Sequence, residues 1–123
     1  MNIYIWCPVL KVTNNQKKEL ENYISILENQ GHYVHSYKKV NQNDNTGYNI
    51  VMEHLKGMNN SDEIHVFWDV NSKGSHFDLG MALVFAETQR KKIILIKCYE
   101  DDEGKSYWKA LNKYCKEYKN KWI

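Results

Sequence analysis

Residues 64–83 read Ile64-His-Val-Phe-Trp-Asp69-Val-Asn-Ser72-Lys-Gly74-Ser75-His-Phe-Asp78-Leu-Gly80-Met-Ala-Leu83. The apolar run predicts a buried strand, and the polar turn after it predicts a helix that begins at about Ser75. Where a strand runs into a helix, the free N–H groups and the dipole of the helix N-terminus favour an anion such as phosphate. We expect Asp78 in the first turn of this helix, where it either caps the helix or acts on a ligand.

The rest of the chain alternates in the same way between strand-like and helix-like periodicity. Strands are expected at residues 3–7, 32–37, 63–68 and 92–97. Helices are expected after the capping box 13–16 and up to Gly31, from Thr46 beyond the polar loop 38–45, from Ser75 to Gln89, and after 101–104. This order predicts parallel strands joined by right-handed crossovers. The expected fold is therefore α/β: a three-layer, Rossmann-like or flavodoxin-like parallel sheet of four to five strands with helices on both faces.

Composition narrows the possible classes of protein. The chain has 123 residues, one proline, 42% hydrophobic residues and a formal charge of +2, which predicts a single domain over residues 1–123. Seventeen basic against fifteen acidic residues do not favour a nucleic-acid polymer or a membrane as partner. Three cysteines without a CxxC pair favour reduced thiols and a cytoplasmic location. The N-terminal residues show no basic segment followed by a long apolar run, and no apolar run reaches membrane-spanning length, so we expect no targeting segment. We also expect neither a metal nor a cofactor.

Ligands of such sheets bind at the carboxyl ends of the strands. Neither the P-loop pattern nor the dinucleotide fingerprint occurs there, which excludes those two classes of nucleotide site. The candidate binding residues at this edge are Trp6, Cys7 and Pro8 after the first strand, and Ser72, Gly74 and Ser75 after the third.

Residues 61–69 and 74–82 resemble the nucleoside 2-deoxyribosyltransferase-like family, including its deoxynucleotide N-hydrolase branch. In that family a carboxylate in a motif of the form acidic-Leu-Gly-x-Ala opens the helix after the third strand and attacks the sugar. Asp78 stands at this position and is followed by Leu79-Gly80-Met81-Ala82. The family's usual nucleophile is Glu, so the carboxylate of this chain sits one methylene closer to the backbone.

The resemblance also implies roles for neighbouring residues. Ser72 falls where the nucleotide-hydrolysing branch binds the 5′-phosphate, and Asp69 falls near a second catalytic acidic group. His54 occupies a position on the second helix where the family has a further acidic residue, and we expect it to contact the substrate. The first strand ends without the family's glycine-rich turn.

The chemistry can be stated from the residues. Breaking an N-glycosidic bond creates an oxocarbenium-like sugar, which the Asp78 carboxylate could capture as an ester. The leaving base needs a proton, for which Asp69, Glu53 and His54 are candidates. Backbone N–H groups near Ser72 could hold a phosphate, and Gly74 would allow its close approach.

Structural explanations compete with each of these roles. Ser75 and Asp78 have the spacing of a capping box, and Trp6 and Trp68 are expected to pack at the rim of the ligand edge. The aromatic stripe of the last helix indicates either core packing or an oligomer contact, and we expect a homo-oligomer. The stripe comprises Tyr107, Trp108, Leu111, Tyr114, Cys115 and Tyr118.

Three classes of function stay open. The first is an N-glycosidase or deoxyribosyltransferase that acts through Asp78 on a small-molecule nucleoside or nucleoside 5′-monophosphate. The second is a nucleotide-binding or sensor domain with weak catalysis. The third is a domain of the Toll/interleukin-receptor type, which acts on NAD or mediates interactions.

Overall fold

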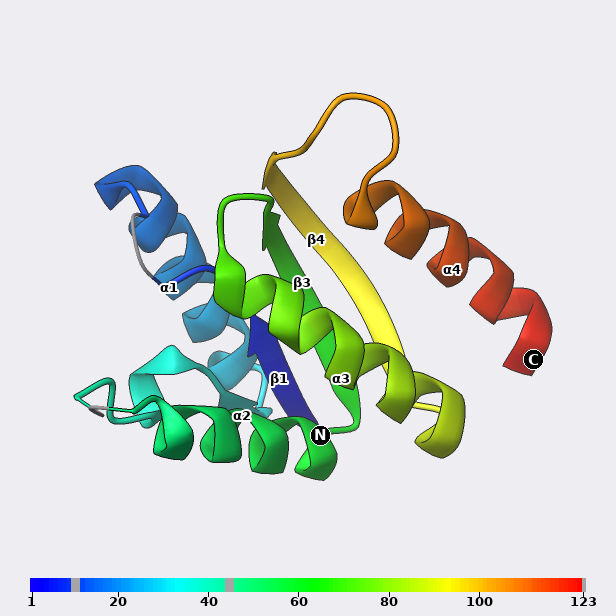
Figure 1. Cartoon of the computed structure of the whole chain (residues 1–123). Coiled ribbons are helices and arrows are strands. Elements are labelled where there is room, and N and C mark those ends of the chain that lie inside the picture. Colours follow the sequence, from blue (N-terminus) through cyan, green and yellow to red (C-terminus); the bar gives the residue numbers. More distant parts are fainter. Residues whose placement is uncertain (10–11, 44–45, 123) are drawn as a thin grey trace.

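The computed structural model describes residues 1–9, 12–43 and 46–122 (Figure 1). Its four strands are all parallel and form one sheet in the order β2-β1-β3-β4. The strands are β1 (Asn2–Trp6), β2 (Tyr33–His35), β3 (Glu63–Asp69) and β4 (Lys92–Glu100). The helices are α1 (Asn14–Asn29), the short 3-10 helix η1 (Tyr37–Lys39), α2 (Tyr48–Asn60), α3 (Lys73–Gln89) and α4 (Tyr107–Trp122). The predicted parallel α/β fold is confirmed.

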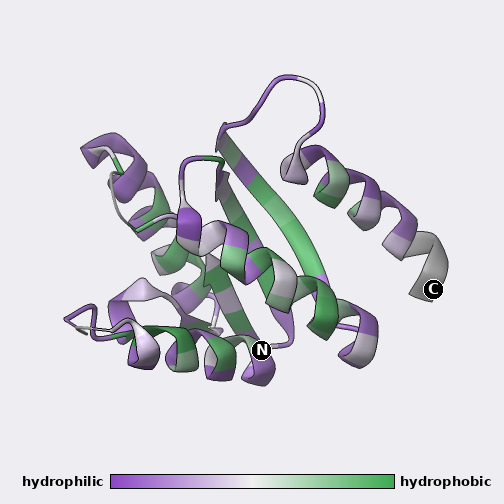
Figure 2. Ribbon diagram, viewed as in Figure 1, coloured by the Kyte–Doolittle hydropathy of each residue, from purple (hydrophilic) through white to green (hydrophobic). Residues whose placement is uncertain are grey.

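Helices cover both faces of the sheet, which gives the expected three layers (Figure 1). Helix α1 packs its apolar side on one face, against a cluster that includes Ile3, Ile5 and Phe67. Helices α2, α3 and α4 contribute side chains to the cluster on the other face. Figure 2 shows the same division, with hydrophobic strands at the centre and hydrophilic residues on the helices around them. From β1 the chain adds β2 on one side and then β3 and β4 on the other, so the strand order reverses between β1 and β3, and this reversal marks the switch point of the sheet.

Local sequence signals place the first helix correctly. Thr13 accepts a hydrogen bond from the Gln16 N–H, and the Gln16 side chain accepts one from the Thr13 N–H, so the predicted capping box is formed. The helix ends before Gly31, whose φ of 91° suits glycine.

The start of α3 differs from the prediction. The helix begins at Lys73 because Ser72, and not Ser75, is its N-cap, with Oγ accepting from the Ser75 N–H at 3.2 Å. Asp78 therefore lies in the second turn, and the first turn holds no acidic residue. The predicted capping box between Ser75 and Asp78 is wrong, as is the placement of Asp78 in the first turn. A dipole or cap role cannot account for Asp78.

Two other elements also end or begin at residues that differ from the prediction. Strand β2 stops at His35 because the buried Ser36 accepts from the Lys38 N–H and caps η1. Helix α2 begins after Gly47, which takes a left-handed conformation, and Thr46 accepts from the Tyr48 N–H. The last two residues of the expected loop 38–45 lie outside the described ranges.

The aromatic side of α4 packs against the protein's own core. Leu111 is buried there, Tyr114 and Tyr118 lie partly buried beside it, and Tyr107 is exposed. This packing explains the stripe without a partner, so the homo-oligomer stays a prediction. Within the described residues, we find no helix that combines the length and the apolar character needed to span a membrane.

Candidate active site

Asp78 places a carboxylate between α3 and the sheet. Its side chain is buried, with 3% of the residue exposed. The Tyr4 hydroxyl donates a hydrogen bond to Oδ2 at 3.2 Å. Oδ1 has no hydrogen-bond partner among the described residues, and Nδ1 of His54 lies 3.6 Å from it. One carboxylate oxygen is therefore held by a hydrogen bond, while the other is buried without one.

Tyr4 occupies the centre of an aromatic group under Asp78. It stands opposite His35 in the register of β1 and β2, and the two rings stack with centroids 5.5 Å apart and planes at 14°. His54 of α2 meets the same phenol ring edge-on, at 6.1 Å. Residues from four elements, β1, β2, α2 and α3, thus converge at the carboxylate.

A small cavity adjoins the Asp78 carboxylate. It is lined by Tyr4, Ile5, Cys7, Val9, His35, Ser36, Tyr37, His54 and Asp78. Several of these residues follow β1 and β2, so the cavity opens at the carboxyl ends of these strands, as the fold predicts. Its volume of about 10 Å³ holds about one water molecule.

A larger cavity lies next to the first and shares Val9 and Tyr37 with it. Its volume is about 280 Å³, near the lower end of the ~300–1,000 Å³ typical of ligand pockets. The lining residues are Pro8, Val9, Val12, Gln16, Lys17, Leu20, Tyr37, Gln42 and Tyr99. Aromatic rings and amide groups on its walls suit a flat, polar ring.

Burial keeps Tyr4 and Cys7, two neighbours of Asp78, in their neutral forms. Burial, followed by the Asp78 charge, raises the pKa of Tyr4 well above its ordinary value, so the phenol stays a donor. The same two causes raise the pKa of the Cys7 thiol to about 12, which excludes a thiolate nucleophile at neutral pH. Burial and the nearby His54 lower the pKa of His35.

The structure brings some of the predicted site residues together. Cys7 and His54 line the Asp78 cavity, and Pro8 lines the adjoining one. Glu53 lines a different cavity, beneath His35. Asp69 accepts hydrogen bonds from the backbone and side-chain nitrogens of Asn71, so it holds the turn after β3. A catalytic role for Asp69 stays a prediction.

Ser72, Gly74 and Ser75 lie at the N-terminus of α3. The Ser75 and His76 N–H groups are used by Ser72, whereas no partner is seen for the Lys73 and Gly74 N–H groups among the described residues. Gly74 is exposed and has open space around its Cα, so an approaching ligand would meet no side chain there. Phosphate binding at this turn stays a prediction.

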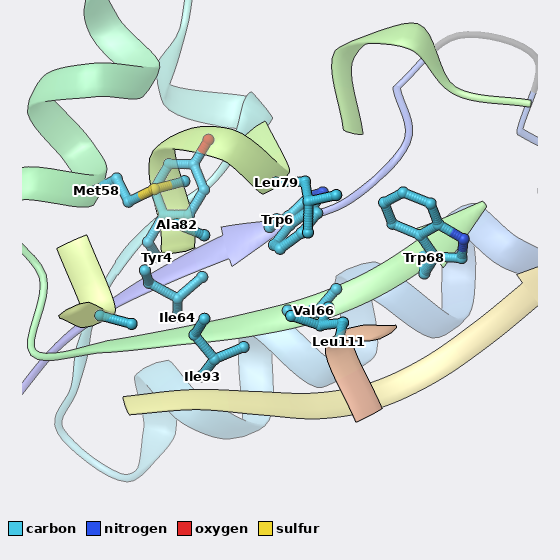
Figure 3. Packing of buried hydrophobic residues seen from close by; sticks show 11 residues of the cluster. Tyr4, Trp6, Met58, Ile64, Val66, Trp68, Leu79, Ala82, Ile93 and Leu111 are labelled. Atoms are coloured by element: carbon cyan, nitrogen blue, oxygen red, sulfur yellow. The ribbon is translucent and has the colours of Figure 1, made fainter. Parts of the chain in front are cut away.

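Trp6 is not a rim residue but a core residue, and its contact with substrate stays a prediction. It is fully buried, and Trp68 is 1% exposed. Their rings meet edge-to-face with centroids 5.8 Å apart. Figure 3 shows Trp6 and Trp68 in the core with Leu79, Val66 and Leu111 nearby. Helices α3 and α4 contribute side chains to the cluster that buries both indoles.

Tyr4 and His35 are site residues that the sequence reasoning missed. One signal was present, since Tyr4 is two residues before Trp6 and therefore shares its face of β1. Another was the position of His35 at the end of a strand next to β1. Within the described ranges, no three His, Cys, Asp or Glu side chains gather as they would to hold a metal ion.

Two solved structures share this arrangement of strands and helices. A CMP N-glycosidase from Clostridium botulinum aligns with a TM-score of 0.59 and 19% identity, over 90% of this chain and 80% of that chain. A 2-deoxyribosyltransferase from Bacillus psychrosaccharolyticus aligns with a TM-score of 0.58 and 19% identity, over 82% of this chain and 76% of that chain. The chain has their fold. The expected resemblance is thus confirmed at the level of the fold.

Sequence comparison adds nothing further, because no protein-family model and no curated protein matches the chain. At 19% identity, the likeness to the two enzymes concerns the arrangement of the backbone. The chemistry of the site depends on the residues of this chain.

Proposed function

We propose that this protein breaks the N-glycosidic bond of a nucleoside or nucleoside 5′-monophosphate, with Asp78 as the nucleophile. The observation that carries the proposal is the Asp78 carboxylate, which is buried, lines a cavity at the ligand edge and keeps Oδ1 free of hydrogen bonds. Burying a polar atom without a hydrogen bond is costly, and ionisable groups in such surroundings are enriched in active sites. The fold shared with an N-glycosidase and a deoxyribosyltransferase supports the same class of reaction.

The proposed reaction has two steps. Oδ1 of Asp78 attacks the anomeric carbon, the bond from that carbon to the base nitrogen breaks, and its electron pair leaves with the base. The hydrogen bond from Tyr4 to Oδ2 orients the carboxylate for this attack. In a hydrolase, water then attacks the anomeric carbon, the ester bond from that carbon to Oδ1 breaks, and the proton of the water passes to the group that protonated the leaving base. In a transferase, the nitrogen of a second base attacks in place of water and gives its proton to the same group.

His54 is the proposed source of the proton for the leaving base. Among the three candidates, it is the one that lines the Asp78 cavity, at 3.6 Å from Oδ1. Glu53 lines another cavity, and Asp69 is engaged by Asn71. We place the base itself in the adjoining cavity, between the rings of Tyr37 and Tyr99.

A substrate panel tests the proposal. Ribo- and deoxyribonucleosides and their 5′-monophosphates are incubated with the protein, with and without a second base, and free and exchanged bases are separated by chromatography. We expect base release from at least one substrate, or base exchange when an acceptor is present. Asp78→Asn should abolish either reaction, whereas Asp102→Asn, a change in an exposed loop, should leave it intact.

Three results would contradict the proposal. Base release at the wild-type rate by Asp78→Asn would remove Asp78 from the mechanism. Nucleotide binding without any turnover would favour a binding or sensor domain. Cleavage of NAD in place of the nucleosides would favour a domain of the Toll/interleukin-receptor type.

A further inference from the structure

The ring of His35 lies against α2 at a glycine. A Cβ built on Gly57 would lie 2.3 Å from Cδ2 of His35 and 2.5 Å from its Nε2, distances that real Cβ atoms essentially never show. The three nearest atoms all belong to the His35 ring. Any side chain at residue 57 would therefore displace this ring.

This contact carries two local disadvantages. Glycine inside a helix is less favourable than alanine, and Gly57 lies within α2, three residues before its last residue. Nε2 of His35 is buried without a hydrogen-bond partner among the described residues. An alanine opposite a smaller apolar residue would avoid both disadvantages. Residues that are locally unfavourable for stability are expected where they contribute to a functional site.

The other contacts of His35 lead to the proposed nucleophile. Its ring stacks on Tyr4, and the hydroxyl of Tyr4 donates to Asp78. We propose that His35 is a positioning residue, whose ring, seated in the space left by Gly57, fixes the Tyr4 phenol and thereby the Asp78 carboxylate. The inference rests on the proposed role of Asp78 as nucleophile.

The charges around His35 agree with a packing role for a neutral ring. His54 and Glu53 approach it from α2, Lys39 from η1, and Tyr4 from β1. Burial is the largest cause that lowers the pKa of His35, and the electrostatic effects of His54 and Lys39 lower it further, despite the opposite effect of Glu53. Near neutral pH the ring can therefore stack on Tyr4 without carrying charge.

Two glycine substitutions provide the main test. Gly57→Ala forces the His35 ring to move, while Gly80→Ala adds the same methyl group to a helix position with open space around it. On a substrate found in the panel above, we expect Gly57→Ala to lower kcat at least about tenfold and to change KM less than about twofold. Gly80→Ala should change neither value more than about twofold.

Removal of the His35 ring shows whether kcat falls because the ring no longer positions Tyr4 or because of the steric clash at residue 57. His35→Ala should show the same loss of kcat as Gly57→Ala, because Tyr4 then lacks its support. The double variant His35→Ala/Gly57→Ala has room for the methyl group, so it should melt as His35→Ala does and should stay slow. Recovery of wild-type kcat in the double variant would overturn the proposal, since the ring itself would then not be needed.

A spectroscopic readout keeps the two proposals apart. In protein labelled with ¹³C at the tyrosine Cζ and aspartate Cγ, His35→Ala and Gly57→Ala should shift the Tyr4 and Asp78 signals, whereas Gly80→Ala should not. Unchanged signals in His35→Ala would overturn the positioning role. If the variants shift these signals but the protein cleaves no nucleoside, the role of Asp78 as nucleophile would be contradicted. The structural link from His35 to Asp78 would still be supported.

Discussion

The hydroxyl of Tyr4 donates a hydrogen bond of 3.2 Å to Oδ2 of Asp78 and so joins the first strand to the third long helix. Both residues are almost fully buried, at 2% and 3% exposure. Little water competes for this bond, so the phenol is the main contact that fixes the direction of the carboxylate. The bond links residues 74 positions apart and therefore exists only in the folded chain.

Tyr4→Phe should lower both stability and activity. The buried carboxylate loses its hydrogen bond, which costs about 1–3 kcal/mol in the free energy of unfolding. The freed carboxylate should also lower kcat about tenfold to a hundredfold. Urea denaturation and the base-release assay measure these effects, and Tyr48→Phe, at an exposed position, is the matched control. Wild-type kcat in Tyr4→Phe would contradict an orienting role.

Asp78→Asn should abolish turnover without weakening the fold. Asp78 is not a helix cap, so the substitution removes no cap bond. The asparagine oxygen can still accept from Tyr4, and the asparagine amide nitrogen would face His54 in place of Oδ1. We expect the free energy of unfolding to stay within about 1 kcal/mol of the wild-type value. A clear loss in urea denaturation would show that the charge supports the fold.

The predicted phosphate site can be tested separately from the helix cap. Ser72→Ala removes the N-cap of α3 and should cost about 1 kcal/mol in stability. If Ser72 holds a 5′-phosphate, this variant should also bind a nucleoside monophosphate about 1.5–3 kcal/mol more weakly and the nucleoside unchanged. Ser72→Asp keeps a capping oxygen but repels phosphate, so it should fold as wild type and bind the monophosphate weakly. Calorimetric titration of the nucleoside and the monophosphate measures these affinities. Equal affinity of the wild-type protein for both ligands would contradict phosphate binding by Ser72.

His35 should make the protein less stable in mild acid. Its pKa in the folded state is lowered, mainly by burial, below the ordinary value of about 6.5. The unfolded chain therefore takes up a proton first, and stability falls as the pH drops through about 6.5 until the folded pKa is passed. Urea denaturation at several pH values between about 7.5 and 5.5 should show a smaller loss for His35→Gln than for wild type. Equal slopes would mean that His35 titrates normally.

Local sequence signals were sufficient for the order of the elements. The switch from alternating to helical periodicity reflects how each element buries one side, and that depends on near neighbours in the chain. The capping box at Thr13 and Gln16 is such a signal, and it formed as predicted. The start of α3 was misplaced because Ser72 and Ser75 can both cap a helix, and spacing alone does not choose between them.

The sequence alone also placed Asp78 at the ligand edge of a parallel sheet. In this fold each strand connects to the next helix at the carboxyl edge of the sheet, and Asp78 lies near the start of such a helix. Only the tertiary structure decided what surrounds it. Tyr4, His35 and His54 come from separate elements, and their rings meet because β1 pairs with β2 in one register while α2 crosses above both. Burial of Trp6 likewise depends on α3 and α4, which lie far along the chain. Periodicity records which side of an element is apolar, but the partner that covers it is set by packing between distant segments.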